Sequence, residues 1–376
     1  MNKLTIEVLT PLHCGTGKYL KGVDIEEAQG NIVVKDVVAF LRDRSFNLED
    51  KIKTIEEGRA SDIPQIKYTL QAPLEGPKSI ERIREAIKDM GHHPYIPAST
   101  VKGAIRTAFF RKKLKENPDI LKGIQANTSP TALVSALFGE DDPLSGLKLS
   151  DSIPLPQKYL GLFQVKTLTV LKYGAVGWKE SEKSNLPEPQ KAASIYLEGI
   201  KPGESSTVMD ITGQVTGIVE VCRAFSSEII AGEVDFFSKL KLKKDTLTKY
   251  NELAELNKAL KSNEFLLPIG WGTGWLSKSL GRGIDPYLME TYRYKYHLGK
   301  SIPHIEHNVC RIHLCRLKRV SGEEFNHCPL CQRDLAPEET VKRPLLITPF
   351  PKTRRLVKEG DKFEPLGWIR GSCSGR

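Results

Sequence analysis

The pattern of hydrophobic and polar residues predicts alternating strands and helices along the first half of the chain. Residues 3–9 (KLTIEVL) alternate apolar and polar side chains, which is typical of a half-buried strand. Residues 31–34 (NIVV) predict a second short strand, and residues 34–43 a short helix. Residues 131–139 (TALVSALFG) predict a helix that ends at a glycine, and residues 162–171 (LFQVKTLTVL) predict a strand.

The second half repeats this alternation. Residues 193–213 contain two β-rich runs around the turn KPGE, which predicts a hairpin. Residues 219–240 and 246–262 predict helices, and a strand from residue 265 leads into a glycine-rich loop. Further strands are expected at residues 344–350 and 365–370. Strands and helices in both halves predict an α+β protein of two ferredoxin-like units.

A polar, proline-containing stretch at residues 179–191 marks the expected domain boundary. The predicted division is an N-terminal domain over residues 1–190 and a second domain over residues 191–300 plus 337–376. Residues 301–336 are expected to form a small insertion between the two parts of the second domain.

Residues 94–115 (PYIPASTVKGAIRTAFFRKKLK) predict a helix with one buried face, because apolar residues recur at helical spacing from Val101 to Phe109. Ser99 or Thr100 is expected to cap it. Lys102, Arg106 and Lys113 fall on a neighbouring stripe, which is suited to phosphate contacts. A glycine inside a helix costs about 1 kcal/mol relative to alanine. Gly103 therefore predicts a closely packed neighbour.

The charge balance favours a polyanionic partner. Lys and Arg number 56 against 46 Asp and Glu, a net charge of +10, with an isoelectric point of about 9.1. Basic surfaces suit nucleic acid, because each neutralised phosphate releases counterions. No apolar run is long enough to span a bilayer, and the first residues lack the apolar core of a signal peptide. A cytoplasmic location without membrane contact is therefore expected.

The loop LTPLHCGTGKYL (residues 9–20) resembles a phosphate cradle but is not a Walker A motif. Leu12 stands where the first glycine is needed, and Tyr19 replaces the magnesium-binding hydroxyl. An acyl-enzyme is also excluded, because Ser99-x-x-Lys102 lacks the S-D-N and K-T-G elements of that class. An ordinary tight turn is the simplest interpretation of the loop taken alone, although its glycines permit close approach to an anion.

A second loop, PIGWGTGWLSK (residues 268–278), combines glycines, two tryptophans and polar side chains. Glycines allow close backbone approach, aromatic rings stack on bases, and hydroxyls and lysine bind phosphate or 2′-hydroxyl groups. A glycine turn with buried tryptophans is the structural alternative. The residues alone favour neither.

Four of the seven cysteines predict a structural zinc site. Cys310, Cys315, Cys328 and Cys331 form two pairs with twelve residues between them. Four thiolates close a tetrahedral Zn²⁺ site and leave no position open for water. His307, His313 or His327 is an alternative for one of the four ligands.

Taken together, these blocks resemble the RAMP superfamily of CRISPR–Cas proteins, and in particular the fifth-subunit family of the type III-A (Csm) effector complex. The likeness lies in LTPLHCGTG, YIPASTVKGAIRTAFF, LPIGWGTGWLSK and the terminal PKTRRLV and PLGW. It implies two RRM-like domains and a non-catalytic role at the crRNA 3′ side, in crRNA maturation and complex assembly for antiviral defence. The implied partners are crRNA, target RNA, neighbouring backbone subunits, and trimming nucleases supplied from elsewhere.

The resemblance also implies which residues contact RNA. They are two glycines and a lysine of the first loop, three residues of the basic helix and four of the second loop: Gly15, Gly17, Lys18, Ser99, Lys102, Arg106, Gly272, Gly274, Ser277 and Lys278. Thr273 of the second loop is added, because its hydroxyl can bond phosphate or a 2′-hydroxyl group. The alternatives are a metal-independent crRNA-processing endoribonuclease with His13 as general base, and a scaffold subunit of another type III complex. The zinc insertion is not implied by the family.

Overall fold

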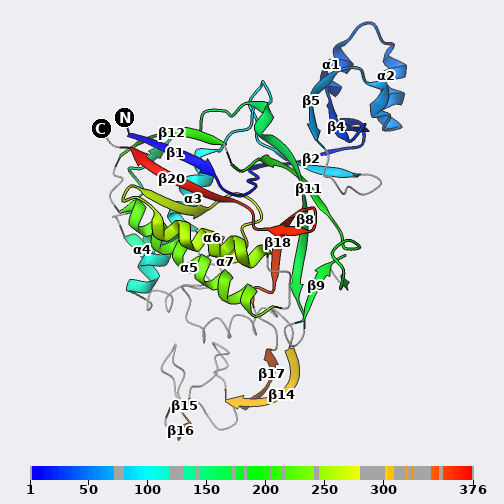
Figure 1. The fold of residues 1–376 in the computed structure, drawn as a ribbon. Coiled ribbons are helices and arrows are strands. Elements are labelled where there is room, and N and C mark those ends of the chain that lie inside the picture. The colour runs from blue at the N-terminus through cyan, green and yellow to red at the C-terminus, as the bar shows by residue number, and fades with distance from the viewer. Residues whose placement is uncertain are drawn as a thin grey trace.

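The computed structural model describes most of the chain. The described residues are 2–71, 80–117, 130–139, 142, 144–171, 175–181, 184–203, 205–213, 217–240, 245–279, 301–308, 319–320, 323–324, 340–346 and 350–374. Two large sheets and one small sheet organise this part of the chain (Figure 1). The four cysteines of the predicted zinc site, and the three alternative histidine ligands, are not among the residues whose side chains are described.

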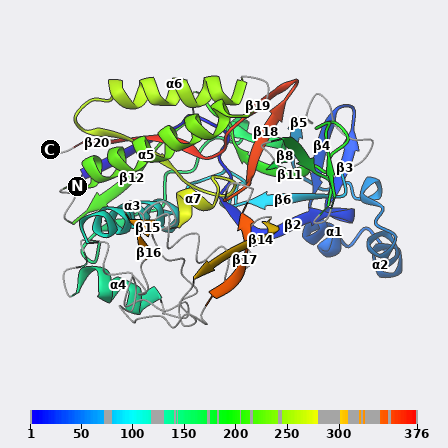
Figure 2. The same ribbon diagram turned by 90° about the horizontal axis from the view of Figure 1, so that it is seen from below.

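The first large sheet has the strand order β13-β20-β1-β12-β7, and all of its pairs are antiparallel. Its strands are β1 (Asn2–Val8), β7 (Lys148–Leu149), β12 (Ser206–Thr212), β13 (Glu264–Pro268) and β20 (Trp368–Ser374). Helices α3 (Ala98–Glu116), α5 (Ile218–Ser238) and α6 (Asp245–Ala259) lie on one side of it (Figures 1 and 2). In chain order this unit contains β1, α3, α4 (Pro130–Phe138), β7, β12, α5, α6, β13 and β20. The order is related to the β-α-β-β-α-β order of a ferredoxin-like unit, with α4 and α6 added and β20 inserted between β13 and β1.

The core of this unit follows from the sequence patterns. Along β1, the inward side chains Leu4, Ile6 and Val8 are almost completely buried, as strict alternation predicts. They belong to one cluster with the inner faces of α3 and α5, including Ile105 and Phe225. Burial of this apolar surface is the main stabilisation of the unit.

The second large sheet has the order β10-β9-β8-β11-β6-β2, with β18 pairing β8 and β19 pairing β18. Its strands are β2 (Gly15–Lys21), β6 (Arg82–Ala86), β8 (Leu160–Val170), β9 (Val176–Lys179), β10 (Asn185–Leu186), β11 (Ile195–Ile200), β18 (Thr353–Glu359) and β19 (Lys362–Glu364). Strands from both sides of residue 190 therefore share each large sheet, so the boundary expected there does not separate two sheets.

A small sheet is inserted between β2 and β6. It contains β3 (Ile25–Ala28), β4 (Asn31–Lys35) and β5 (Ile66–Gln71), accompanied by α1 (Val37–Arg42) and α2 (Leu48–Glu56). The completely buried Glu198 of β11 joins it to the second large sheet, because the Tyr68 hydroxyl donates to Glu198 Oε1 at 2.6 Å. Lys88 completes the buried site by pairing with Glu198 Oε2.

Four further strands and two short α-helices are also described. Strand β14 (Ser301–Asn308) pairs β17 (Thr340–Leu346), and β15 (Arg319–Val320) pairs β16 (Glu323–Glu324). Helices α4 (Pro130–Phe138) and α7 (Trp275–Lys278) flank α3. Among the described helices, none is long and apolar enough to cross a membrane.

The hairpin predicted at residues 193–213 is wrong. Both strands form, but β11 pairs β6 and β8, whereas β12 pairs β1 and β7, so the turn between them connects two different sheets. Each strand is central in its own sheet. Both edges of each strand are already hydrogen-bonded to strands that are distant in the sequence.

The expected cap of α3 is also wrong. The helix begins at Ala98, and Ser99 and Thr100 lie inside its first turn. The Ala98 amide instead donates to Asp151 Oδ1 at 2.7 Å. A carboxylate from a distant loop therefore satisfies one of the free N–H groups and interacts favourably with the positive end of the helix dipole.

Candidate functional site

Three of the sequence blocks meet at one pocket. The loop after β1, one face of α3 and the loop from β13 into α7 enclose a volume of ≈ 380 Å³. The lining residues are His13, Cys14, Gly15, Thr100, Gly103, Ala104, Thr107, Pro268, Ile269, Gly270, Trp271, Ser277 and Lys278. The four residues of α3 are spaced i, i+3, i+4 and i+7, so a single helix face forms this wall.

The loops around the pocket are joined by backbone hydrogen bonds. The Trp271 amide donates to the His13 carbonyl at 2.8 Å, and the Ile269 amide donates to the Gly367 carbonyl at 2.8 Å. Gly270 has φ +72°, and a Cβ there would lie 2.6 Å from the His13 oxygen. The glycine at this position is therefore required for contact between two loops.

His13 is held as a neutral imidazole at the pocket. It is 3% exposed, and its Nδ1 lies 2.6 Å from the Glu198 carbonyl oxygen, so Nδ1 carries the proton and donates. Burial lowers the pKa of His13, and the charges of Arg84, Lys88 and Lys278 lower it further against the effect of that hydrogen bond. Nε2 faces Gly15, where a Cβ would lie 2.5 Å away.

A group of arginine and aromatic side chains lies beside the pocket. The guanidinium carbons of Arg84, on β6, and Arg355, on β18, lie 4.9 Å and 4.5 Å from the centre of the Trp271 ring. Arg84 is also 5.0 Å from the Tyr19 ring on the neighbouring strand β2. Such contacts hold guanidinium groups in place without neutralising their charge.

Three positive charges lie together at this place. Within the described part of the chain, no carboxylate forms an ion pair with Arg84, Arg355 or Lys278. Burial and the neighbouring Arg84 lower the pKa of Arg355. The pKa of Lys278 is also lowered, by burial first and by Arg355 as well, although the thiol of Cys14 acts in the opposite direction. Mutually repelling cations without counter-charges form a site that an anion would stabilise.

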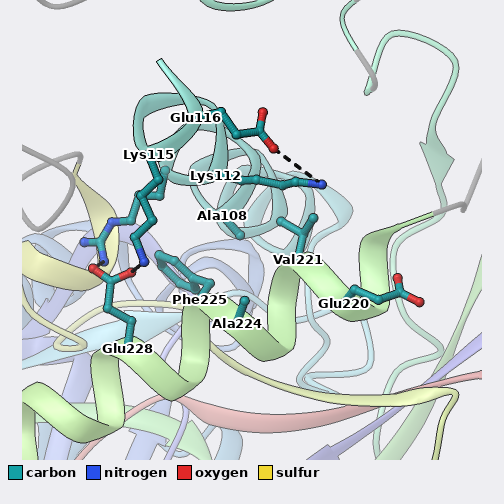
Figure 3. Close-up of a pocket in the computed structure, with 10 residues that line it drawn as sticks. Ala108, Lys112, Lys115, Glu116, Glu220, Val221, Ala224, Phe225 and Glu228 are labelled. Carbon is teal, nitrogen blue, oxygen red and sulfur yellow. Dashed lines mark ion pairs between the residues drawn. The ribbon is translucent and has the colours of Figure 1, made fainter. Parts of the chain in front are cut away.

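A second pocket, of ≈ 390 Å³ between α3 and α5, provides a contrast (Figure 3). Its floor is apolar, formed by side chains such as Val221 and Phe225. Its cations are neutralised, because Lys115 lies 2.7 Å from Glu228 and Lys112 lies 3.8 Å from Glu116. Two pockets of similar size therefore differ in free charge, and the cations at and beside the first suit an anionic ligand.

Three of the residues predicted to contact RNA line the first pocket: Gly15, Ser277 and Lys278. Gly17 and Lys18 are exposed on β2 next to it. Gly272, Thr273 and Gly274 shape the second loop. Gly272 and Gly274 have φ values of +91° and +90°, and the Thr273 carbonyl accepts the Ser277 hydroxyl at 2.9 Å.

The predicted residues of the basic helix do not line the pocket. Ser99 is exposed in the first turn of α3. Lys102 Nζ donates to the Leu147 carbonyl at 2.5 Å, and Arg106 lies 3.8 Å from Asp142. The close neighbour expected at Gly103 is absent, because nothing described lies within 4 Å of a Cβ built there. The pocket faces Gly103 instead.

The sequence interpretation missed Arg84, Arg355 and Arg111. Arg82 and Arg84 are two residues apart on one strand, so both side chains lie on the same face of the sheet. This spacing could have indicated a basic patch on that face from the sequence. Arg111 is 1% exposed, and its guanidinium donates to the Ser279 carbonyl at 3.0 Å and to the Leu276 carbonyl. It thereby fixes α7, which carries Lys278, and only the tertiary structure reveals this.

Comparison with known proteins supplies the family context. The model of the RAMP superfamily matches residues 5–277. One chain of a cryo-EM structure described as a Csm–crRNA–target RNA ternary complex of a type III-A CRISPR-Cas system is 21% identical, with a TM-score of 0.61 and 100% of both chains covered. The crystal structure of T. onnurineus Csm5 is 20% identical, with a TM-score of 0.52, covering 97% of this chain and 99% of the other. Among curated proteins, no significant match is found.

Proposed function

Because the chain belongs to the RAMP superfamily, we propose that it is an RNA-binding, non-catalytic subunit of a type III-A CRISPR effector complex. The fold it shares along its whole length with Csm5 and with a chain of a Csm–crRNA complex supports this proposal. Its partners would be crRNA, target RNA and neighbouring subunits, in the cytoplasm. Its place would be at the crRNA 3′ side, where it supports trimming by separate nucleases.

One observation carries the RNA-binding role: the cluster of Arg84, Arg355 and Lys278 has no ion-pair partner among the described residues. An RNA phosphate would supply the missing negative charge. Trp271 and Tyr19 hold the arginines in place, so little side-chain freedom would be lost on binding.

The test is the affinity of the full chain for end-labelled, single-stranded crRNA over a range of salt concentrations. Arg355→Glu and Lys278→Glu are expected to weaken binding by tenfold or more and to reduce the salt dependence by about one counterion each. Lys258→Glu is the matched control, because it makes the same change of charge at an exposed position on α6. Equal losses in all three variants would show that only net charge matters and would contradict the site.

The endoribonuclease is a second candidate function, and the state of His13 favours it. A general base must be neutral and positioned, and His13 has a lowered pKa and an Nδ1–H that is fixed by Glu198. Lys278 at the same pocket would stabilise a charged transition state. A discrete cut in repeat-containing RNA that survives chelation and disappears in His13→Ala would establish it. Binding without cleavage would support the scaffold.

A structural zinc ion on Cys310, Cys315, Cys328 and Cys331 remains part of the proposal. Metal analysis of the purified chain is expected to give one zinc per molecule, and Cys328→Ser with Cys331→Ser is expected to remove it. The chelated arm of the cleavage assay requires a check of the fold, because removal of structural zinc can unfold its ligand segment.

A further inference from the structure

Neither helix stability nor side-chain packing explains why residue 103 is a glycine. It lies inside the nineteen-residue helix α3, where glycine is less stable than alanine. Its φ is not in the left-handed region, and no described atom lies within 4 Å of a Cβ placed there. Gly103 is exposed and lines the pocket, so a Cβ there would meet open space beside the pocket.

The lining of the pocket is mostly neutral, and Lys278 is the one cation among its described residues. Its walls include Ala104, Pro268 and Ile269, and the His13 imidazole at its side is neutral. Arg84 and Arg355 are not part of the lining but contact the ring of Trp271, which is, and with Lys278 they form what we call the cationic rim of the pocket. A ligand that fits this arrangement has a neutral, flat, hydrogen-bonding part inside and a negative charge at the rim.

We infer that this pocket receives the base of one unpaired ribonucleotide, with the adjoining phosphate at Arg355 and Lys278. This inference rests on the proposed RNA-binding function and adds the place and the form of the ligand. A volume of ≈ 380 Å³ lies near the lower end of the range for small-ligand sites, which is room for one nucleotide and not for a duplex. Two hydrogen-bond acceptors of the lining would meet the edge of the base, His13 Nε2 and the hydroxyl oxygen of Thr107. The Thr107 hydroxyl donates its proton to the Gly103 carbonyl at 3.0 Å, so its oxygen remains free to accept.

Gly103 provides a matched pair of variants. Gly103→Ala adds one carbon where a Cβ meets nothing, so the pocket stays open and the helix gains stability. Gly103→Leu is expected to place a branched side chain into the same space and to fill part of the pocket. Thermal unfolding is expected to show both variants at least as stable as the native chain.

The experiment measures affinity and photo-cross-linking of the full chain to a crRNA that carries single 4-thiouridine substitutions. Native protein and Gly103→Ala are expected to cross-link one position strongly to a peptide containing residues 268–278 or 100–107. Gly103→Leu is expected to lose that cross-link and to bind at least tenfold more weakly. An abasic nucleotide at the cross-linked position is expected to weaken native binding to the same extent and to have no further effect on Gly103→Leu.

The outcomes separate this inference from the proposed function. One outcome overturns the inference: Gly103→Leu keeps both its affinity for RNA and the cross-link, while Arg355→Glu loses binding. RNA would then contact the cations without placing a base in the pocket. If Arg355→Glu and Lys278→Glu also bind normally, the proposed RNA site itself is wrong. Loss of binding in Gly103→Ala as well as in Gly103→Leu would likewise contradict the inference, because the alanine leaves the pocket open.

Discussion

At the scale of single residues, the site depends on where charge is compensated and where it is not. Glu198 is completely buried, yet it pairs with Lys88 and accepts hydrogen bonds from Tyr68 and the Ala86 amide. Arg84 and Arg355 lie nearby without such partners among the described residues. Burial of a charge is tolerated when it is paired and hydrogen-bonded. The unpaired cations are consequently the ones available for a ligand.

His13 predicts a pH dependence of stability at this scale. Its pKa in the folded chain is below 6.5, so the unfolded chain binds the proton first as the pH falls. The contribution of His13 is therefore fully present above about pH 6.5 and is lost progressively below it, by at most about 1.4 kcal/mol per pH unit.

Thermal unfolding at pH 7.5 and pH 5.0 measures this effect. The native chain is expected to lose more stability between the two values than His13→Asn, in which an amide replaces the titrating ring. His92, whose pKa is also lowered, contributes equally to both proteins and cancels in the comparison. The same pH response in both proteins would show that His13 is not held neutral.

At the scale of elements, helices and strands are joined by a few buried polar contacts in addition to the apolar core. Arg354 on β18 forms a bidentate pair with Glu233 on α5, at 2.6 Å and 3.1 Å. The guanidinium also lies 3.9 Å from the centre of the Phe236 ring. This contact connects the second large sheet, which carries Arg355, to a helix of the first.

Glu233→Ala is expected to destabilise the fold by about 3–5 kcal/mol, because it leaves the nearly buried Arg354 without its carboxylate. Urea unfolding measures the change. Glu255→Ala on α6 removes one partner of an exposed pair, with side chains 74% and 72% exposed, and is expected to cost less than about 1 kcal/mol. Similar losses in the two variants would contradict a structural role for the buried pair.

At the scale of the whole molecule, the two ends of the chain lie in the same sheet. Strand β20 is hydrogen-bonded to β1 on one edge and to β13 on the other. It also buries Trp368, which is 2% exposed. The C-terminal segment is therefore a central part of the ferredoxin-like unit (Figure 1).

A chain that ends before Trp368 is expected to be insoluble or unfolded, although it lacks only the last nine residues. Removal of β20 exposes the edges of β1 and β13 together with their apolar faces. A chain that ends at residue 374 is the control and is expected to unfold like the full chain in circular dichroism. Cooperative unfolding of the shorter chain at normal temperature would contradict this arrangement.

Much of this architecture is predictable from local patterns. The alternation in β1, the long α3 and the runs that became α5 and α6 specify their own elements, because periodicity and burial are local properties. The glycine loops and their polar residues also indicated the region of the site. Gly15, Ser277 and Lys278 were identified before the fold was known, and the structure brings them to one pocket.

Other features depend on partners that are distant along the chain. Strands β11 and β12 look like a hairpin in sequence, but each is taken up by a different sheet. Asp151, not Ser99, caps α3, and Gly103 faces a pocket instead of a neighbour. The strand arginines Arg84 and Arg355 form one cluster only because β6, β18 and the loop at Trp271 converge.

The sequence by itself determined the elements, the basic character and the loops at which a ligand could be approached. The tertiary structure alone decided which cations lack a polar partner among the described residues, since Lys102 donates to the Leu147 carbonyl and Arg106 pairs with Asp142. Charge compensation is a property of spatial neighbours, and the interaction of two charges depends on their distance in space. Residue types and spacing therefore predict where binding is possible, and packing decides which residues are free to bind.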